Sequence, residues 1–80
     1  MKVRVYVTLK EGILDPQGKA VKHSLNTLGY SSVEDVRIGK YIELNLNNNS
    51  IDKLDFQIKE MCNKLLANTI IEDFRYEIEK

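Results

Sequence analysis

The chain has 80 residues, of which 12 are lysine or arginine and 12 are aspartate or glutamate, so its formal net charge at pH 7 is zero. Nucleic-acid-binding proteins need surplus positive charge to displace counterions from phosphates, so we expect no nucleic-acid partner. No apolar run approaches the roughly 20 residues that span a bilayer, and we expect no membrane partner. One cysteine cannot form an internal disulfide, which favours a cytoplasmic protein.

A chain of this length forms one domain at most, and we expect that domain to span residues 1–80. The hydrophobic fraction of 42% is sufficient for a core and too high for a disordered chain. A core of this size seldom supplies more than about 3–5 kcal/mol of stability. Because the sequence offers no internal disulfide and no metal-ligand cluster, we expect association with other chains as the reinforcement.

The first half of the chain predicts a strand followed by a helix. Apolar and polar residues alternate from Val3 to Leu9, which is typical of a half-buried strand. Asp15 is an N-cap, and Pro16 suits the first helical position. Gly29 ends the helix as a left-handed C-cap. The predicted apolar face of this helix consists of Ala20, Val21, Ser24, Leu25 and Leu28.

A β-hairpin is predicted next. Residues 36–38 indicate one strand and residues 42–46 another, with a three-residue loop at 39–41 between them. This register places Arg37 opposite Glu43 on the outer face of the sheet, where the two charges form a favourable cross-strand pair.

The second half predicts another helix and a last strand. Residues 47–50 form a turn cluster that supplies an N-cap. An apolar stripe at helical spacing follows, made of Ile51, Leu54, Ile58, Met61, Cys62 and Leu65. Phe56 lies off this stripe, and Asn68 is the expected C-cap. Charged and apolar residues then alternate over 73–79, which indicates a fourth strand.

The element order β-α-β-β-α-β predicts an α+β fold of the ferredoxin-like plan. We expect four strands in one antiparallel sheet and two helices on one of its faces. The opposite face is expected to be polar, with Arg4, Tyr6, Thr8, Arg37, Glu43, Asn45, Arg75 and Glu77.

No catalytic, cofactor-binding or metal-binding residue is predicted. Cys62 lies within the apolar stripe, where a free cysteine packs as a small hydrophobe. His23 falls on a solvated helix face, with no cysteine or carboxylate at ligand spacing. The carboxylates show no catalytic pairing, and the glycines form no phosphate-binding loop.

Two features indicate contact surfaces instead. Phe56 is an apolar side chain that faces away from the predicted core. In the loops, capping chemistry explains Asp15 but leaves Gln17, Arg37 and Lys40 without a structural role. The candidate partner contacts are therefore Asp15, Gln17, Arg37, Lys40 and Phe56.

Three parts of the sequence resemble signature stretches of a known family, the PurS subunit of phosphoribosylformylglycinamidine synthase. The similar stretches are residues 14–21 with 28–29, residues 36–40 with 43–44, and residues 65–68 with 71–73 and 76–77. The likeness covers essentially the whole chain, in the right order and at the right length. Thr69 stands where the family often has proline, at a turn position.

The resemblance implies a PurS-like fold and a role in de novo purine biosynthesis. In this family a glutaminase subunit releases ammonia, and a large synthetase subunit uses ATP to convert formylglycinamide ribonucleotide to the amidine. The small subunit, a homodimer or a dimer of dimers, bridges the two and supports ammonia transfer. The chain would then belong to a glutamine- and ATP-dependent C–N ligase complex without an active site of its own. ATP, Mg²⁺ and glutamine would be used by its partners.

Two other functions stay open from the sequence. Ferredoxin-like regulatory domains pair side by side and bind a small ligand beside a Gly-rich first loop. In this sequence only Gly12 and Gly18 correspond to such a loop. An RNA-binding sheet stacks bases on strand aromatics. The zero net charge and the missing aromatic signature on the third strand disfavour RNA.

Overall fold

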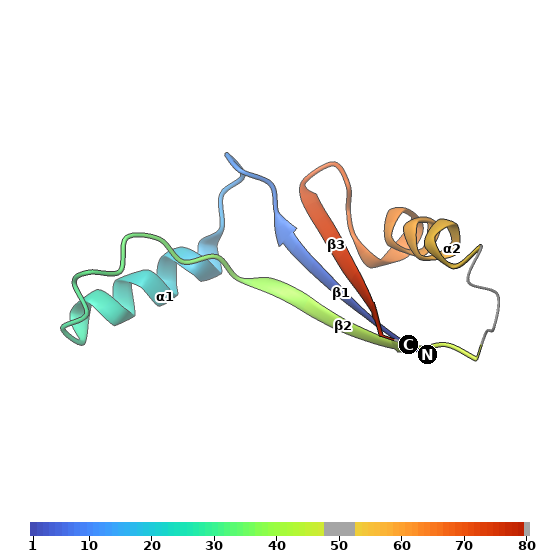
Figure 1. The fold of residues 1–80 in the computed structure, drawn as a ribbon. Helices are drawn as coiled ribbons and strands as arrows, with labels where there is room; N and C mark the ends of the chain where they lie inside the picture. Colours follow the sequence, from blue (N-terminus) through green and yellow to red (C-terminus); the bar gives the residue numbers. More distant parts are fainter. Residues whose placement is uncertain (48–52, 80) are drawn as a thin grey trace.

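The computed structural model describes residues 1–47 and 53–79. In chain order the elements are β1 (Lys2–Leu9), α1 (Pro16–Thr27), β2 (Gly39–Asn45), α2 (Leu54–Met61), the π-helix η2 (Cys62–Leu66) and β3 (Glu72–Glu79). The three strands form one antiparallel sheet in the order β2-β1-β3 (Figure 1). The predicted α+β class is confirmed.

One face of the sheet and the second helix enclose the core. The valines of the central strand β1 are almost completely buried, because alternation turns all of them to the same face. Leu54 and Ile58 of α2 and Cys62 at the start of η2 complete the core, each with no more than 1% exposed. Partly buried strand side chains pack around it, namely Ile42, Leu44, Phe74, Tyr76 and Ile78. The alternation predicted for these strands is confirmed.

The prediction of a fourth strand and a hairpin is wrong. Residues 36–38 are not part of the sheet, and β2 begins at Gly39 and pairs along its length with β1. Gly39 pairs with Thr8 in the sheet, so it is a strand residue and not the predicted turn residue. A Cβ at Gly39 would lie 2.3 Å from the Val7 carbonyl oxygen, so the absent side chain lets the two strands approach. Three alternating residues indicate extended backbone but not a pairing partner.

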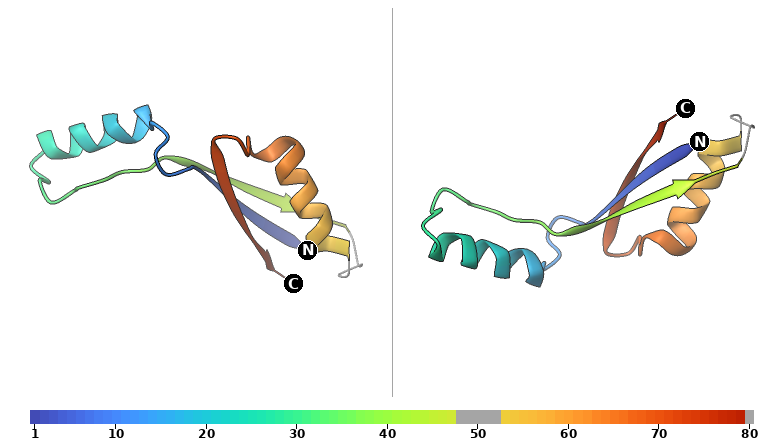
Figure 2. Two further views of the ribbon diagram at one scale, coloured as in Figure 1. Left: turned by 90° about the horizontal axis from the view of Figure 1, so that it is seen from above. Right: turned by 90° about the horizontal axis from the view of Figure 1, so that it is seen from below.

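The prediction that both helices cover the sheet is also wrong. α2 lies over one face, whereas α1 extends beyond the end of the sheet (Figures 1 and 2). The chain then runs back along α1 before it enters β2. We call residues 16–37, which comprise α1 and this return segment, the arm. The arm makes the molecule elongated, with extents of 50 × 26 × 14 Å.

The apolar stripe of the second helix changes direction at η2. A hydrogen bond from the Ala67 N–H to the Cys62 carbonyl oxygen (2.9 Å) closes its wider turn. Because a π-turn holds more residues than the 3.6 of an α-turn, the positions after Cys62 rotate away from their α-helical places. Leu65 is therefore 83% exposed, contrary to prediction, and Leu66 packs against the core instead.

The helix ends agree with the sequence in part. Asp15 caps α1, and Gly29 follows its end with a φ of +107°, as predicted. The C-cap after η2 is Ala67, so the prediction for Asn68 is wrong by one residue. Asn68 instead forms the turn into β3 through its backbone and side chain. The helix start expected at 47–51 lies, from residue 48 on, outside the described residues.

Candidate interaction surfaces

The Asp15 carboxylate joins two segments at the base of the arm. Its Oδ1 accepts a hydrogen bond from the Gly18 N–H (2.8 Å), and its Oδ2 accepts one from the Ile38 N–H (2.9 Å). These N–H groups, Ile38 first, hold the pKa of the Asp15 carboxyl below its ordinary value, and the charge of Arg37 adds to the effect. Asp15 is therefore ionised at neutral pH, with both oxygens engaged within its own chain.

Gly18 is required by close packing at the same place. A Cβ built on Gly18 would lie 2.2 Å from the Val36 carbonyl oxygen and 2.8 Å from Asp15 Oδ2. Both distances are far shorter than van der Waals contact, so α1 can approach the return segment only where a side chain is absent. Helix packing thus explains Gly18 without a ligand-binding loop.

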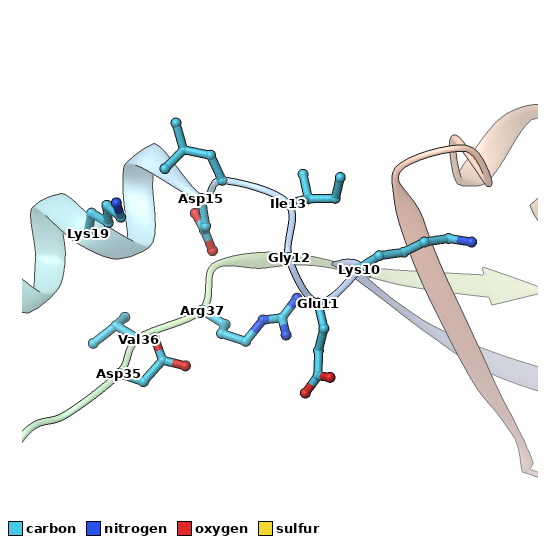
Figure 3. A pocket seen from close by; sticks show the side chains of 10 residues that line it. Lys10, Glu11, Gly12, Ile13, Asp15, Lys19, Asp35, Val36 and Arg37 are labelled. Carbon is cyan, nitrogen blue, oxygen red and sulfur yellow. The ribbon is translucent and has the colours of Figure 1, made fainter.

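Two hollows flank the base of the arm. The larger, of about 610 Å³, lies between the chain that leaves β1 and the return segment (Figure 3). Its charged lining residues are Lys10, Glu11, Asp15, Lys19, Asp35 and Arg37. The smaller, of about 350 Å³, is lined in part by Asp15, Gln17 and Lys40. The structure thus brings Gln17 and Lys40 together on one side of Asp15 and places Arg37 on the other.

Lys40 has partners within the chain. Its Nζ donates to the Leu66 carbonyl oxygen at the end of η2 (3.2 Å) and lies 3.8 Å from the Glu72 carboxylate. A cation at a helix C-terminus faces the negative end of the helix dipole. Lys40 therefore ties β2 to the end of η2, a structural role that loop spacing in the sequence could not indicate.

Phe56 lies on α2, at the other end of the molecule from the arm, and is 66% exposed, as predicted. Gln17 and Arg37 are also exposed. Their roles as partner contacts stay predictions, and they would serve two separate regions of the surface, one on α2 and one at the base of the arm.

The apolar surface of the arm is the feature that sequence reasoning missed. The residues predicted to cover the sheet are largely solvent exposed, and Leu28 is 72% exposed. The large apolar side chains exposed on the arm and just before it are Ile13, Leu14, Val21, Leu28 and Tyr30. Single exposed apolar residues are normal, but a group of them on one projecting element is a candidate interaction surface. The helical spacing of the apolar residues in the sequence indicates that α1 has an apolar face. It does not indicate what covers that face.

The sheet face that α2 leaves open is polar, as predicted, with two corrections. Arg37 does not lie on this face, and Glu43 stands opposite Arg4 instead. Arg4 and Arg75 form ion pairs with strand carboxylates, and the Arg75 guanidinium lies 3.9 Å from the centroid of the Tyr6 ring. Both guanidinium groups are therefore paired with carboxylates of the same face.

Neither Cys62 nor His23 is placed for catalysis. Cys62 is completely buried, and burial raises the pKa of its thiol, so the unreactive protonated form persists at neutral pH. His23 is exposed on α1, as predicted. Among the described residues, no cluster of His, Cys, Asp and Glu side chains is placed to hold a metal ion. Within 1–47 and 53–79, no helix combines the length and apolar character needed to cross a bilayer.

A small α+β domain with an uncovered apolar arm is a protein of the class that works by association with other chains. The family model PurS, described as phosphoribosylformylglycinamidine (FGAM) synthase, matches residues 2–80. The chain is 61% identical over 79 residues to the phosphoribosylformylglycinamidine synthase subunit PurS of Bacillus subtilis, which covers 99% of this chain and 93% of that protein. The chain belongs to the PurS family of FGAM synthase subunits, and the resemblance seen in the sequence is confirmed.

Solved structures of the family share this fold. Bacillus subtilis PurS superposes with a TM-score of 0.89 at 61% identity, over 99% of this chain and 98% of that one. Methanocaldococcus jannaschii PurS, one of the subunits of formylglycinamide ribonucleotide amidotransferase in the purine biosynthetic pathway, gives 0.86 at 38% identity, over 99% and 95%. A chain of the PurLQS structure from Thermotoga maritima gives 0.85 at 25% identity, over 95% and 93%. The chain is thus a small subunit of FGAM synthase, a ligase of purine biosynthesis.

Proposed function

We propose that this chain is the non-catalytic bridge of FGAM synthase. It holds a glutaminase subunit and an ATP-dependent synthetase subunit in a fixed relation and supports ammonia transfer between them. The observation that carries the proposal is the exposed apolar arm, which projects from a domain whose core is formed without it. A similar chain occurs in the PurLQS structure of Thermotoga maritima, whose name joins three components, and this supports assembly with two further subunits.

The physical role is positional. Ammonia released into water is diluted, and near neutral pH it becomes ammonium, which has no lone pair for attack on an activated amide. A bridge that aligns the two active sites raises the effective concentration of the transferred molecule. Such a subunit needs defined surfaces and no reactive group. The buried, protonated Cys62 and the engaged Asp15 carboxylate are consistent with this role.

A second copy of the chain is the occupant that we propose for the apolar side of the arm. A homodimer with two-fold symmetry would cover two identical arms at once, and dimers could pair further. Each valine or leucine side chain that becomes fully buried contributes roughly 1.5–3 kcal/mol, which is large beside the stability of so small a core. Phe56, Gln17 and Arg37 then remain available for the other subunits.

The chain is proposed to bind no cofactor itself. ATP, Mg²⁺ and glutamine are consumed or bound by the synthetase and glutaminase subunits, and the complex works in the cytoplasm. The chain contributes to their reactions only by holding the two subunits in a fixed relation.

Two measurements test this function. The tagged full chain should recover a glutaminase and an ATP-dependent synthetase from native extract, both identified by mass spectrometry. In a reconstituted mixture, omission of the chain should abolish amidine formation from glutamine but leave formation from added ammonium salt, because abundant ammonia needs no bridge. Equal loss of both activities would contradict the bridging role, as would turnover of any substrate by the isolated chain.

Cys62→Ser should leave glutamine-dependent synthase activity nearly unchanged at a temperature where the variant is folded. We expect a loss of about 1–3 kcal/mol in the free energy of unfolding, because the more polar hydroxyl replaces the thiol in a buried, apolar position. Urea unfolding of the chain and turnover of the reconstituted complex provide the two measurements. Complete inactivation of a folded Cys62→Ser variant would contradict a structural role for the thiol.

A further inference from the structure

We infer that Asp15 is the positioning residue that fixes the direction of the arm relative to the sheet, rather than a contact for a partner subunit. Its importance for FGAM synthase rests on the proposed function, because a bridge must present its apolar arm at a defined angle. Asp15 acts through α1 and has no part in bond making or breaking.

The chain passes between sheet and arm at two places, and the Asp15 side chain joins them. The first crossing leads from β1 through residues 10–15, and the second leads through Ile38 into β2. If the two crossings were not joined, rotation about a few backbone torsions could change the orientation of α1 relative to the sheet. The hydrogen bonds of Asp15 to the N–H groups of Gly18 and Ile38, at 2.8 and 2.9 Å, connect the first turn of α1 to the residue directly before β2. The side chain of Asp15 thus links the two crossings, and this link restricts the orientation of α1.

The same contacts define what a substitute at position 15 can and cannot do. Serine is also a good helix N-cap, but it offers a single acceptor oxygen on a shorter side chain. Asp15→Ser can therefore keep the hydrogen bond from Gly18 but not the one from Ile38. Because the side chain of serine is smaller than that of aspartate, this variant separates the cap of α1 from the tie to β2 without adding a steric clash.

The arm direction can be measured directly in the full chain. Spin labels are placed at two exposed positions, His23→Cys on the polar side of α1 and Asn45→Cys in β2. Cys62 is kept, because its thiol is completely buried. Pulsed electron–electron double resonance measures the distance between the two labels. Dilution with unlabelled chain ensures that both labels belong to the same chain. We expect a narrow distance distribution with Asp15 and a broad one with Asp15→Ser, at equal helix content by circular dichroism. Asp35→Ser is the matched control, because it removes a carboxylate from the same hollow and leaves both Asp15 bonds in place.

Amide hydrogen exchange gives a second readout at single residues. In Asp15→Ser the Ile38 amide should exchange about tenfold faster while the Gly18 amide stays protected, because only the tie to β2 is lost. A purely capping role for Asp15 would instead leave Ile38 exchange and the distance distribution unchanged in Asp15→Ser, and either result would overturn the inference.

The reconstituted synthase separates this inference from the proposed function. If arm direction matters for bridging, Asp15→Ser lowers glutamine-dependent activity and spares ammonium-dependent activity. If the distance distribution broadens while glutamine-dependent activity is retained, the positioning role of Asp15 stands and the proposed bridging by the arm fails.

Discussion

Leu28→Lys is expected to dissociate the proposed homodimer into monomers at micromolar concentration. Leu28 is 72% exposed on the arm in the single chain, and we propose that a second copy covers it. Full burial of a leucine contributes roughly 1.5–3 kcal/mol, and two-fold symmetry applies the loss twice. Because about 1.4 kcal/mol corresponds to a tenfold change in Kd, the dissociation constant should rise by at least about 100-fold.

Sedimentation velocity over a concentration series measures this change. His23→Lys is the matched control, because it adds the same side chain to the opposite, polar side of the same helix. The control should sediment as the parent does. If Leu28→Lys remains associated over the same concentrations, the arm is not the dimer interface, and the proposal that a second copy covers it is wrong.

Ile58→Ala is expected to leave much of the protein unfolded at 25 °C. Ile58 is completely buried on α2, and truncation of such a side chain typically costs about 2–5 kcal/mol through lost burial and the cavity that remains. The whole core of a chain this small supplies only about 3–5 kcal/mol. The variant therefore loses most of its margin of stability, unless association with other chains compensates.

Urea unfolding, followed by circular dichroism, measures the destabilisation by Ile58→Ala. Phe56→Ala is the control on the same helix. Phe56 is 66% exposed, so its removal should change the free energy of unfolding by no more than about 0.5 kcal/mol. Phe56→Ala should nevertheless weaken assembly if Phe56 is a partner contact. Comparable destabilisation by the two variants would mean that α2 does not pack on the sheet through the Ile58 side.

The predictions that the structure confirms rest on patterns that repeat within a few residues. Strict alternation placed the valines of β1 in the core, and helical spacing separated buried Ile58 from exposed Phe56. Capping chemistry placed Asp15 at the start of α1. The error at Leu65 also has a local origin, because the sequence does not indicate where an α-helix widens into a π-turn.

The structure brings three of the predicted contact residues together, and their role as partner contacts stays a prediction. Asp15, Gln17 and Lys40 were selected as loop residues, and they do line one hollow. The sequence did not show that Asp15 bonds Ile38 across 23 positions or that Lys40 reaches the end of η2 across 26. Such contacts depend on how separate segments meet, and no periodicity records them.

Periodicity was enough to establish which side of each strand and of the two α-helices is apolar, since side-chain direction follows from backbone geometry alone. It could not establish what covers an apolar side. The same spacing in α1 suits a helix on its own sheet and a helix that reaches another chain, and only the packed structure shows α1 lying beyond the sheet. The prediction of four strands failed for the same reason: residues 36–38 alternate as a strand would, but a strand exists only where a neighbour supplies hydrogen bonds.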